Sequence, residues 1–197
     1  GKFVMKRFFL FAALFCAVMS AYAQRGRAFD WTIALVNQRH SVAISADRPV
    51  RMETGEIFHF YIKSGADCFV YVIAQGSDNS VFVFYGNSLK GDEELRVGPA
   101  ELTPPPGTET FFVVVSAGAQ RKLEQALAAY QKSPGSPRAA RAVMNEVFAL
   151  RRDISGLDQS PEQPVYMGGA FRDGGAPLAG LRFSGSDTYV KTFNIGH

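Results

Sequence analysis

Short runs of alternating apolar and polar residues recur along the chain and predict β-strands. Residues 57–63 show the pattern most clearly, with one face apolar and the other polar. The two faces are Phe58, Phe60 and Ile62 against His59, Tyr61 and Lys63. Residues 68–74 are apolar at every position, as expected for a strand buried on both faces. The turn-forming residues 75–80 separate this run from residues 81–85, which predicts an antiparallel hairpin ending at 86–88.

Other runs rich in β-branched and aromatic residues predict further strands. They are residues 29–36, 41–44, 109–115, 165–167 and 187–195. A polar stretch at 92–96 and three consecutive prolines at 104–106 predict loops, because proline cannot donate a ladder hydrogen bond.

The hydrophobic period becomes helical after Ala117. Leu123, Leu127 and Tyr130 recur at helical spacing, and residues 133–135 interrupt the pattern. Ser136-Pro137 then offers an N-cap followed by proline at the first helical position, and a second helix is predicted to run toward Arg152. Its apolar stripe consists of Val143, Met144, Val147, Phe148 and Leu150.

These elements predict a mainly β protein. We expect an antiparallel β-sandwich, Ig-like or Greek-key-like, with an α-helical hairpin at about 118–153 inserted before the last strand. Residues 24–197 are enough for a single domain with its own core.

The first 23 residues have the features of a secretory signal peptide. Met5-Lys6-Arg7 supplies the positive region, residues 8–19 the apolar core, and Ala21-Tyr22-Ala23 a cleavage site, with residues 1–4 as an upstream extension. An apolar run of this length is short for a membrane anchor. Lipoprotein attachment at Cys16 is disfavoured because a bulky Phe15 precedes it. We therefore expect a periplasmic or secreted protein, cleaved after Ala23.

Removal of this leader changes the charge and the cysteine content. Taking Lys2, Lys6 and Arg7 from 21 basic residues leaves 18, equal to the 18 acidic residues. A neutral chain does not favour a nucleic acid as partner. Cys68 would be the single remaining cysteine, which excludes an intramolecular disulfide.

Several of these segments resemble the DUF4384 domain family. The resemblance rests on Gly55-Glu56, residues 67–74 with 81–87, Pro106-Gly107-Thr108-Glu109 with 112–116, and residues 189–197. The chain departs from the family pattern at Asp78-Asn79-Ser80 and at Tyr85-Gly86-Asn87. The resemblance implies a β-sandwich-like module of unassigned function, found after signal peptides or attached to enzymes, and it leaves the helical segment outside.

Few residues suggest catalysis or metal binding. Cys68 and His59 could form a nucleophile and base, but a cysteine in an apolar strand usually behaves as a small buried hydrophobe. His40, His59 and His197 lack the spacing of a zinc site. Asp92-Glu93-Glu94 could hold calcium, although a solvated loop is the simpler interpretation. We predict no catalytic, cofactor or metal residues and no cofactor.

Two surface features favour a binding function. The predicted helices carry a basic surplus, which could meet another envelope protein or, peripherally, an anionic membrane: Arg121, Lys122, Lys132, Arg138, Arg141, Arg151 and Arg152. An exposed aromatic row on the hairpin, either Phe82 and Phe84 or Val81, Val83 and Tyr85, would suit a peptide or glycan. We expect a non-catalytic binding or assembly module. The alternatives are a cell-envelope hydrolase using Cys68 and a structural subunit of an envelope complex.

Overall fold

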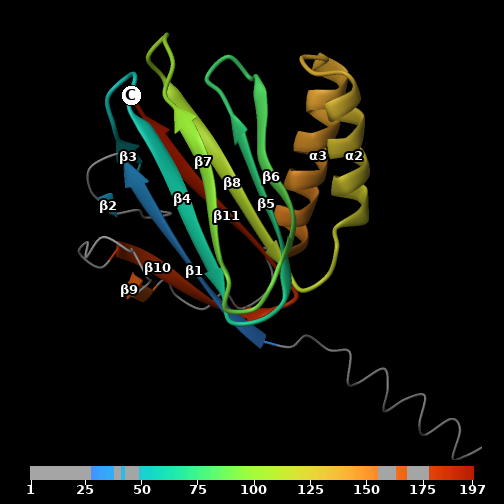
Figure 1. Ribbon diagram of the computed structural model, residues 1–197. Coiled ribbons are helices and arrows are strands. Elements are labelled where there is room, and N and C mark those ends of the chain that lie inside the picture. Colours follow the sequence, from blue (N-terminus) through green and yellow to red (C-terminus); the bar gives the residue numbers. More distant parts are fainter. Residues whose placement is uncertain (1–27, 38–40, 43–48, 155–162, 168–177) are drawn as a thin grey trace, which may run out of the picture.

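Two β-sheets form the body of the molecule (Figure 1). The computed structural model describes residues 28–37, 41–42, 49–154, 163–167 and 178–197. The first sheet has the order β7 (Glu94–Glu101), β4 (Ile57–Ser64), β1 (Ala28–Asn37), β10 (Leu178–Ser186) and β9 (Gln163–Met167), with β2 (Ser41–Val42) also paired to β1. The second sheet has the order β3 (Val50–Arg51), β11 (Thr188–Gly196), β8 (Thr108–Ser116), β5 (Cys68–Gln75) and β6 (Val81–Leu89). All strand pairs are antiparallel except β3 with β11.

The main core lies between the two sheets and is rich in aromatic rings. Phe58 and Phe60 of β4 meet Phe111 of β8 with ring centroids 5.5 and 5.2 Å apart. Trp31 of β1 stacks on Phe183 of β10 at 4.6 Å. The inward residues of each strand alternate with outward ones, as sheet-on-sheet packing requires. The predicted β-sandwich is therefore confirmed.

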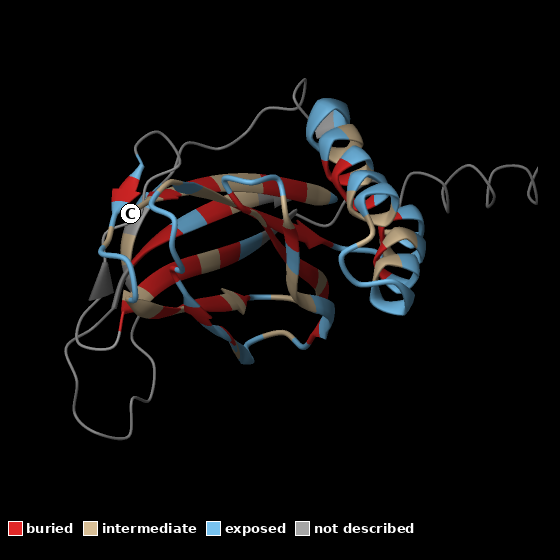
Figure 2. Cartoon of the chain, turned by 90° about the horizontal axis from the view of Figure 1, so that it is seen from above, coloured by how far each residue is buried: buried red, intermediate tan, exposed pale blue. Residues whose placement is uncertain are grey.

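A pair of helices forms a third layer on the outer face of the second sheet. The helical pair consists of α2 (Arg121–Lys132) and α3 (Pro137–Ile154). Seen from above, the buried side of each helix faces the sheet and the opposite side faces solvent (Figure 2). A second apolar cluster fills this boundary: Tyr71, Ile73, Val81, Phe112, Val114, Leu123, Leu127, Val143, Met144, Val147 and Val190. The predicted helical hairpin thus exists, and its apolar stripes cover the sheet.

The position of β5 between two layers explains its uniformly apolar sequence. Val70 and Val72 face the first sheet, whereas Tyr71 and Ile73 face the helical pair. All four side chains are fully buried. A strand covered on both faces favours apolar residues at successive positions, as the sequence pattern predicted.

The predicted end of the hairpin at residues 86–88 is wrong, because β6 continues to Leu89. Gly86 lies at the point where α2 approaches the sheet. A Cβ there would be 3.4 Å from Leu127 Cδ1 and 3.5 Å from Tyr71 Cδ1. The glycine therefore marks close approach of a helix within a strand, and the sequence pattern suggested a turn.

The sequence analysis missed three strands, β3, β7 and β10. β7 includes part of the stretch predicted as a loop, and it pairs with β4 through an irregular register between Phe58 and Phe60. Gly98, with φ of 122°, lies beside this irregularity, so Gly98-Pro99 belongs to a bulged edge strand. β10 pairs with β1 over Ile33 to Ala28 despite its glycines. The prediction that one face of β4 is polar is also partly wrong, since Tyr61 on that face is buried.

Candidate functional site

Cys68, the proposed nucleophile, lies in the core between the sheets. Its residue surface is 2% exposed, and it packs with the inter-sheet apolar cluster. Desolvation by burial raises the pKa of the thiol, since a buried thiolate loses its hydration. The raised pKa disfavours the thiolate that nucleophilic attack requires.

His59 lies on the other side of the first sheet from Cys68. Its neighbours Phe58 and Phe60 point into the core, so the side chain of His59 points outward. There its Nε2 is 3.0 Å from Nη2 of Arg96. Burial, followed by the charge of Arg96, lowers the pKa of His59. The structure does not bring the imidazole and the thiol together.

We expect Cys68 to be protected from thiol reagents in the folded protein. Labelling by an aromatic disulfide should be at least ~100-fold slower for the native chain than for the chain in denaturant, because reaction requires an opening of the core. Absorbance of the released thiolate measures both rates. Fast, stoichiometric labelling of the native chain would contradict the buried position and favour the hydrolase alternative.

The remaining candidate ligands are dispersed. Among the described residues, no three His, Cys, Asp or Glu side chains group as a metal site would require. In the acidic run, Asp92 belongs with Gly91 to a turn before β7, and Oδ1 of Asp92 lies 4.0 Å from Nζ of Lys63. His197 contacts Thr54 through Nδ1 at 3.1 Å. His40 lies outside the described residues.

The expected aromatic row on the hairpin is not continuous. Val81 and Val83 pack against the helical pair, whereas Phe84 and Tyr85 pack against the inter-sheet core. Phe82 alone among these five is exposed, at 50%. The irregular register between Val72 and Ile73, which offsets β6 against β5, divides the row between the two faces.

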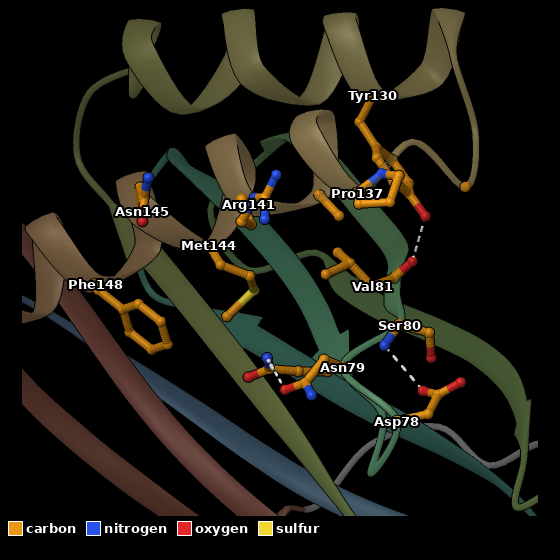
Figure 3. Close-up of a pocket in the computed structure, with 13 residues that line it drawn as sticks. Asp78, Asn79, Ser80, Val81, Tyr130, Pro137, Arg141, Met144, Asn145 and Phe148 are labelled. Atoms are coloured by element: carbon orange, nitrogen blue, oxygen red, sulfur yellow. Dashed lines mark hydrogen bonds between the residues drawn. The ribbon is translucent and has the colours of Figure 1, made fainter.

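A pocket lies where the β5–β6 turn meets the helical pair (Figure 3). Its volume is about 560 Å³, within the usual range for small-molecule sites. Four segments line it. The turn contributes Gln75, Asp78, Asn79, Ser80 and Val81; α2 contributes Tyr130; the loop between the helices contributes Gly135; and α3 contributes Pro137, Ala140, Arg141, Met144, Asn145 and Phe148.

Hydrogen bonds hold the turn side of the pocket in shape. The amide of Gly76 donates to the carbonyl of Ser80 at 2.9 Å, and the amide of Ser80 donates to Oδ1 of Asp78 at 2.9 Å. Asn79 adopts a φ of 65°, which asparagine tolerates better than most residues. Nε2 of Gln75 donates to Oδ1 of Asn79 at 3.2 Å. The turn is therefore ordered before any ligand arrives.

The helical side is anchored equally well. The hydroxyl of Tyr130 donates to the carbonyl of Val81, which ties the end of α2 to the beginning of β6. Ser136 caps α3, since its Oγ accepts from the amide of Ala139 at 3.4 Å. Met144 and Phe148 reach from α3 toward the strands in Figure 3. The ring of Phe148 meets Phe112 edge to face at 5.7 Å and remains 37% exposed.

At its N-terminal end, α2 is fixed to the sheet by a polar network around Tyr71. The hydroxyl of Tyr71 donates to Oε1 of Glu124 at 2.8 Å and accepts from the amide of Gln120 at 3.0 Å. Nε2 of Gln120 donates to Oγ of Ser116 at 2.7 Å and to Oγ1 of Thr188 at 3.2 Å. Burial raises the pKa of Tyr71 to about 12. Helix α2 is thus held to the sheet at both ends.

Charges of both signs line the pocket. Asp78 belongs to the turn, and hydrogen bonds from the hydroxyl and amide of Ser80 lower the pKa of its carboxyl group. Arg141 is exposed on α3, and within the described ranges no acidic side chain forms an ion pair with it. An ionised carboxylate and a guanidinium therefore belong to opposite walls.

Comparisons with known proteins returned no relatives. No family model, no curated protein and no solved structure matches the chain. The resemblance to DUF4384 therefore stays a prediction.

The described part of the chain has no helix with the length and apolarity needed to cross a membrane. The predicted signal peptide lies outside the described residues. The basic residues named from the sequence are all exposed on the helical pair. Their exposure follows from the burial of the opposite, apolar stripe.

Proposed function

We propose that this chain is an exported, non-catalytic binding or assembly module of the cell envelope. Its recognition surface is the pocket at the border of the helical pair, together with the adjoining exposed side of α3. The observation that carries the proposal is the pocket itself, an apolar hollow with charged and amide groups around it, built on elements that are already ordered. A DUF4384-like sandwich would then serve as the scaffold.

Two properties of the surface support this assignment. The pocket exposes Phe148, and an exposed aromatic side chain beside a hollow is a common anchor point for a partner. Arg141 in its lining and the other exposed basic side chains of the helical pair would attract an acidic partner and increase the rate of encounter. Another envelope protein is the partner we propose, and any contact with the membrane would be peripheral.

Deletion of the helical hairpin would be a poor test of this proposal. Deletion of the helical hairpin would expose the apolar outer face of the second sheet, including Tyr71, Ile73 and Phe112. Such a truncated chain would lose binding through misfolding or gain it through non-specific association. A surface substitution that fills the pocket avoids both outcomes.

Replacing the exposed Asn145 with tryptophan is expected to abolish capture of a partner from envelope extract. The indole would occupy the pocket from its α3 wall. Ala128→Trp is the matched control, because Ala128 is exposed on α2 and does not line the pocket. Quantitative mass spectrometry of captured proteins measures the effect, with thermal unfolding to confirm that both variants fold. Equal capture by Asn145→Trp and the unmodified chain would contradict the proposal.

A further inference from the structure

The pocket combines three kinds of surface. Its turn wall includes Asp78, its α3 wall includes Arg141, and the surface of the pocket is mainly apolar. The apolar part comes from Val81, Met144 and Phe148. Each kind of surface favours a different part of a ligand, so the set restricts what can bind.

The two charged groups are available to a ligand. Both side chains are exposed, and in the part of the chain that the structure describes Arg141 has no ion-pair partner. Oδ1 of Asp78 accepts from Ser80, and the carboxylate has a second oxygen that can accept from a cation. The hydrogen bond from Ser80 already holds the side chain of Asp78, so of the two charged side chains a ligand needs to order only that of Arg141.

Resting on the binding function proposed above, we propose that the pocket binds a short peptide with free termini and an apolar side chain. The peptide carboxylate pairs with Arg141 and its ammonium group with Asp78. The apolar side chain lies against Met144 and Phe148. The amide of Asn145, which is exposed on the rim, is placed to hydrogen bond with the peptide backbone.

Other ligand classes fit the walls less well. A fatty acid or an anionic lipid would pair with Arg141 but would bring its negative charge or its tail against Asp78. A neutral hydrocarbon would desolvate both charges without pairing either of them, which is costly. A zwitterion with an apolar centre satisfies all three surfaces. The volume of about 560 Å³ has room for a peptide of a few residues.

Calorimetric titration of the full chain with the tripeptide Ala-Phe-Ala tests the proposal. We expect saturable binding that weakens about tenfold when the peptide is amidated at its C-terminus, and about tenfold when it is acetylated at its N-terminus, because each change removes a charge-assisted contact. Arg141→Gln should lose the sensitivity to amidation and keep the sensitivity to acetylation. Asp78→Asn should show the reverse, and asparagine preserves the acceptor for Ser80.

Matched controls separate the pocket from general electrostatics. Arg138→Gln and Glu93→Gln change exposed charges that do not line the pocket, and both should bind the peptide as the unmodified chain does. Absence of binding at millimolar peptide would overturn the peptide proposal, as would binding that neither terminal modification alters. The capture experiment with Asn145→Trp decides the proposed function independently, so a failed titration with successful capture would reject only the ligand class.

Discussion

Replacing Val147 with aspartate is expected to disrupt the second apolar cluster, between the helical pair and the sheet. The substitution should lower the free energy of unfolding by at least about 4 kcal/mol. Val147 is 0% exposed and lies between α3 and the second sheet. A carboxylate there would lose its hydration, and the surrounding cluster offers it only apolar neighbours. Since whole domains are stable by only about 5–15 kcal/mol, the variant should be largely unfolded or strongly destabilised.

Ala142→Asp is the matched control for this substitution. Ala142 is exposed on the same helix, so the same charge change should cost less than about 1 kcal/mol through helix propensity alone. Urea unfolding followed by circular dichroism measures both variants. Equal, small effects would show that α3 does not pack on the sheet in solution, and would contradict the three-layer arrangement.

Replacing Tyr71 with phenylalanine is expected to lower the free energy of unfolding by about 2 kcal/mol at neutral pH. The change removes the hydroxyl that donates to Glu124 and accepts from the amide of Gln120. Both groups lie at the beginning of α2, so the loss acts on the anchoring of the helical pair. The aromatic ring remains and leaves no cavity.

The contribution of Tyr71 should also depend on pH in the alkaline range. Its pKa is about 12 in the folded protein against an ordinary value of 10.0, so the unfolded chain releases the proton first as pH rises. The stabilisation is complete below pH 10 and is lost between pH 10 and pH 12. Midway, at about pH 11, linkage removes about 1.4 kcal/mol of it.

The difference in stability between the unmodified chain and Tyr71→Phe measures this effect. We expect about 2 kcal/mol at pH 9 and about 0.6 kcal/mol at pH 11, because other titrating groups cancel between the two proteins. Urea unfolding at the two pH values gives both differences. A difference that stays constant between them would mean that Tyr71 titrates normally and that the network does not form.

The sequence pattern predicted most elements because their periodicities reflect which faces are buried. The alternation in residues 57–63 and the apolar run at 68–74 correspond to β4 and β5. The helical spacing of Leu123 and Leu127 corresponds to the buried stripe of α2. The pattern gave the wrong element where glycine or proline, which usually mark a turn or loop, lie inside a strand for reasons of tertiary packing. Gly86 lies within a strand at a point where helix α2 packs closely against it, and Gly98-Pro99 lies beside a bulge on an edge strand.

The pocket was beyond the sequence analysis for a different reason. Its walls come from the β5–β6 turn, from Tyr130, from Gly135 and from α3, and at least 49 residues separate the turn from the helical residues. No spacing rule connects Asp78 with Arg141. The one signal in the sequence was the polar run Asp78-Asn79-Ser80 in the predicted turn, where the resemblance to DUF4384 leads one to expect a glycine turn. The basic surplus of the predicted helices indicated an interaction surface, but it gave no sign of the pocket beside that surface.

Site-specific photo-crosslinking in living cells would locate the recognition surface directly. A benzoylphenylalanine residue at Asn145 would lie on the rim of the pocket, and one at Ala128 would lie on the exposed side of α2 away from it. We expect a discrete adduct from position 145 and none from position 128. Adducts from position 128 alone, or from neither position while the chain still captures a partner from extract, would contradict recognition at the pocket.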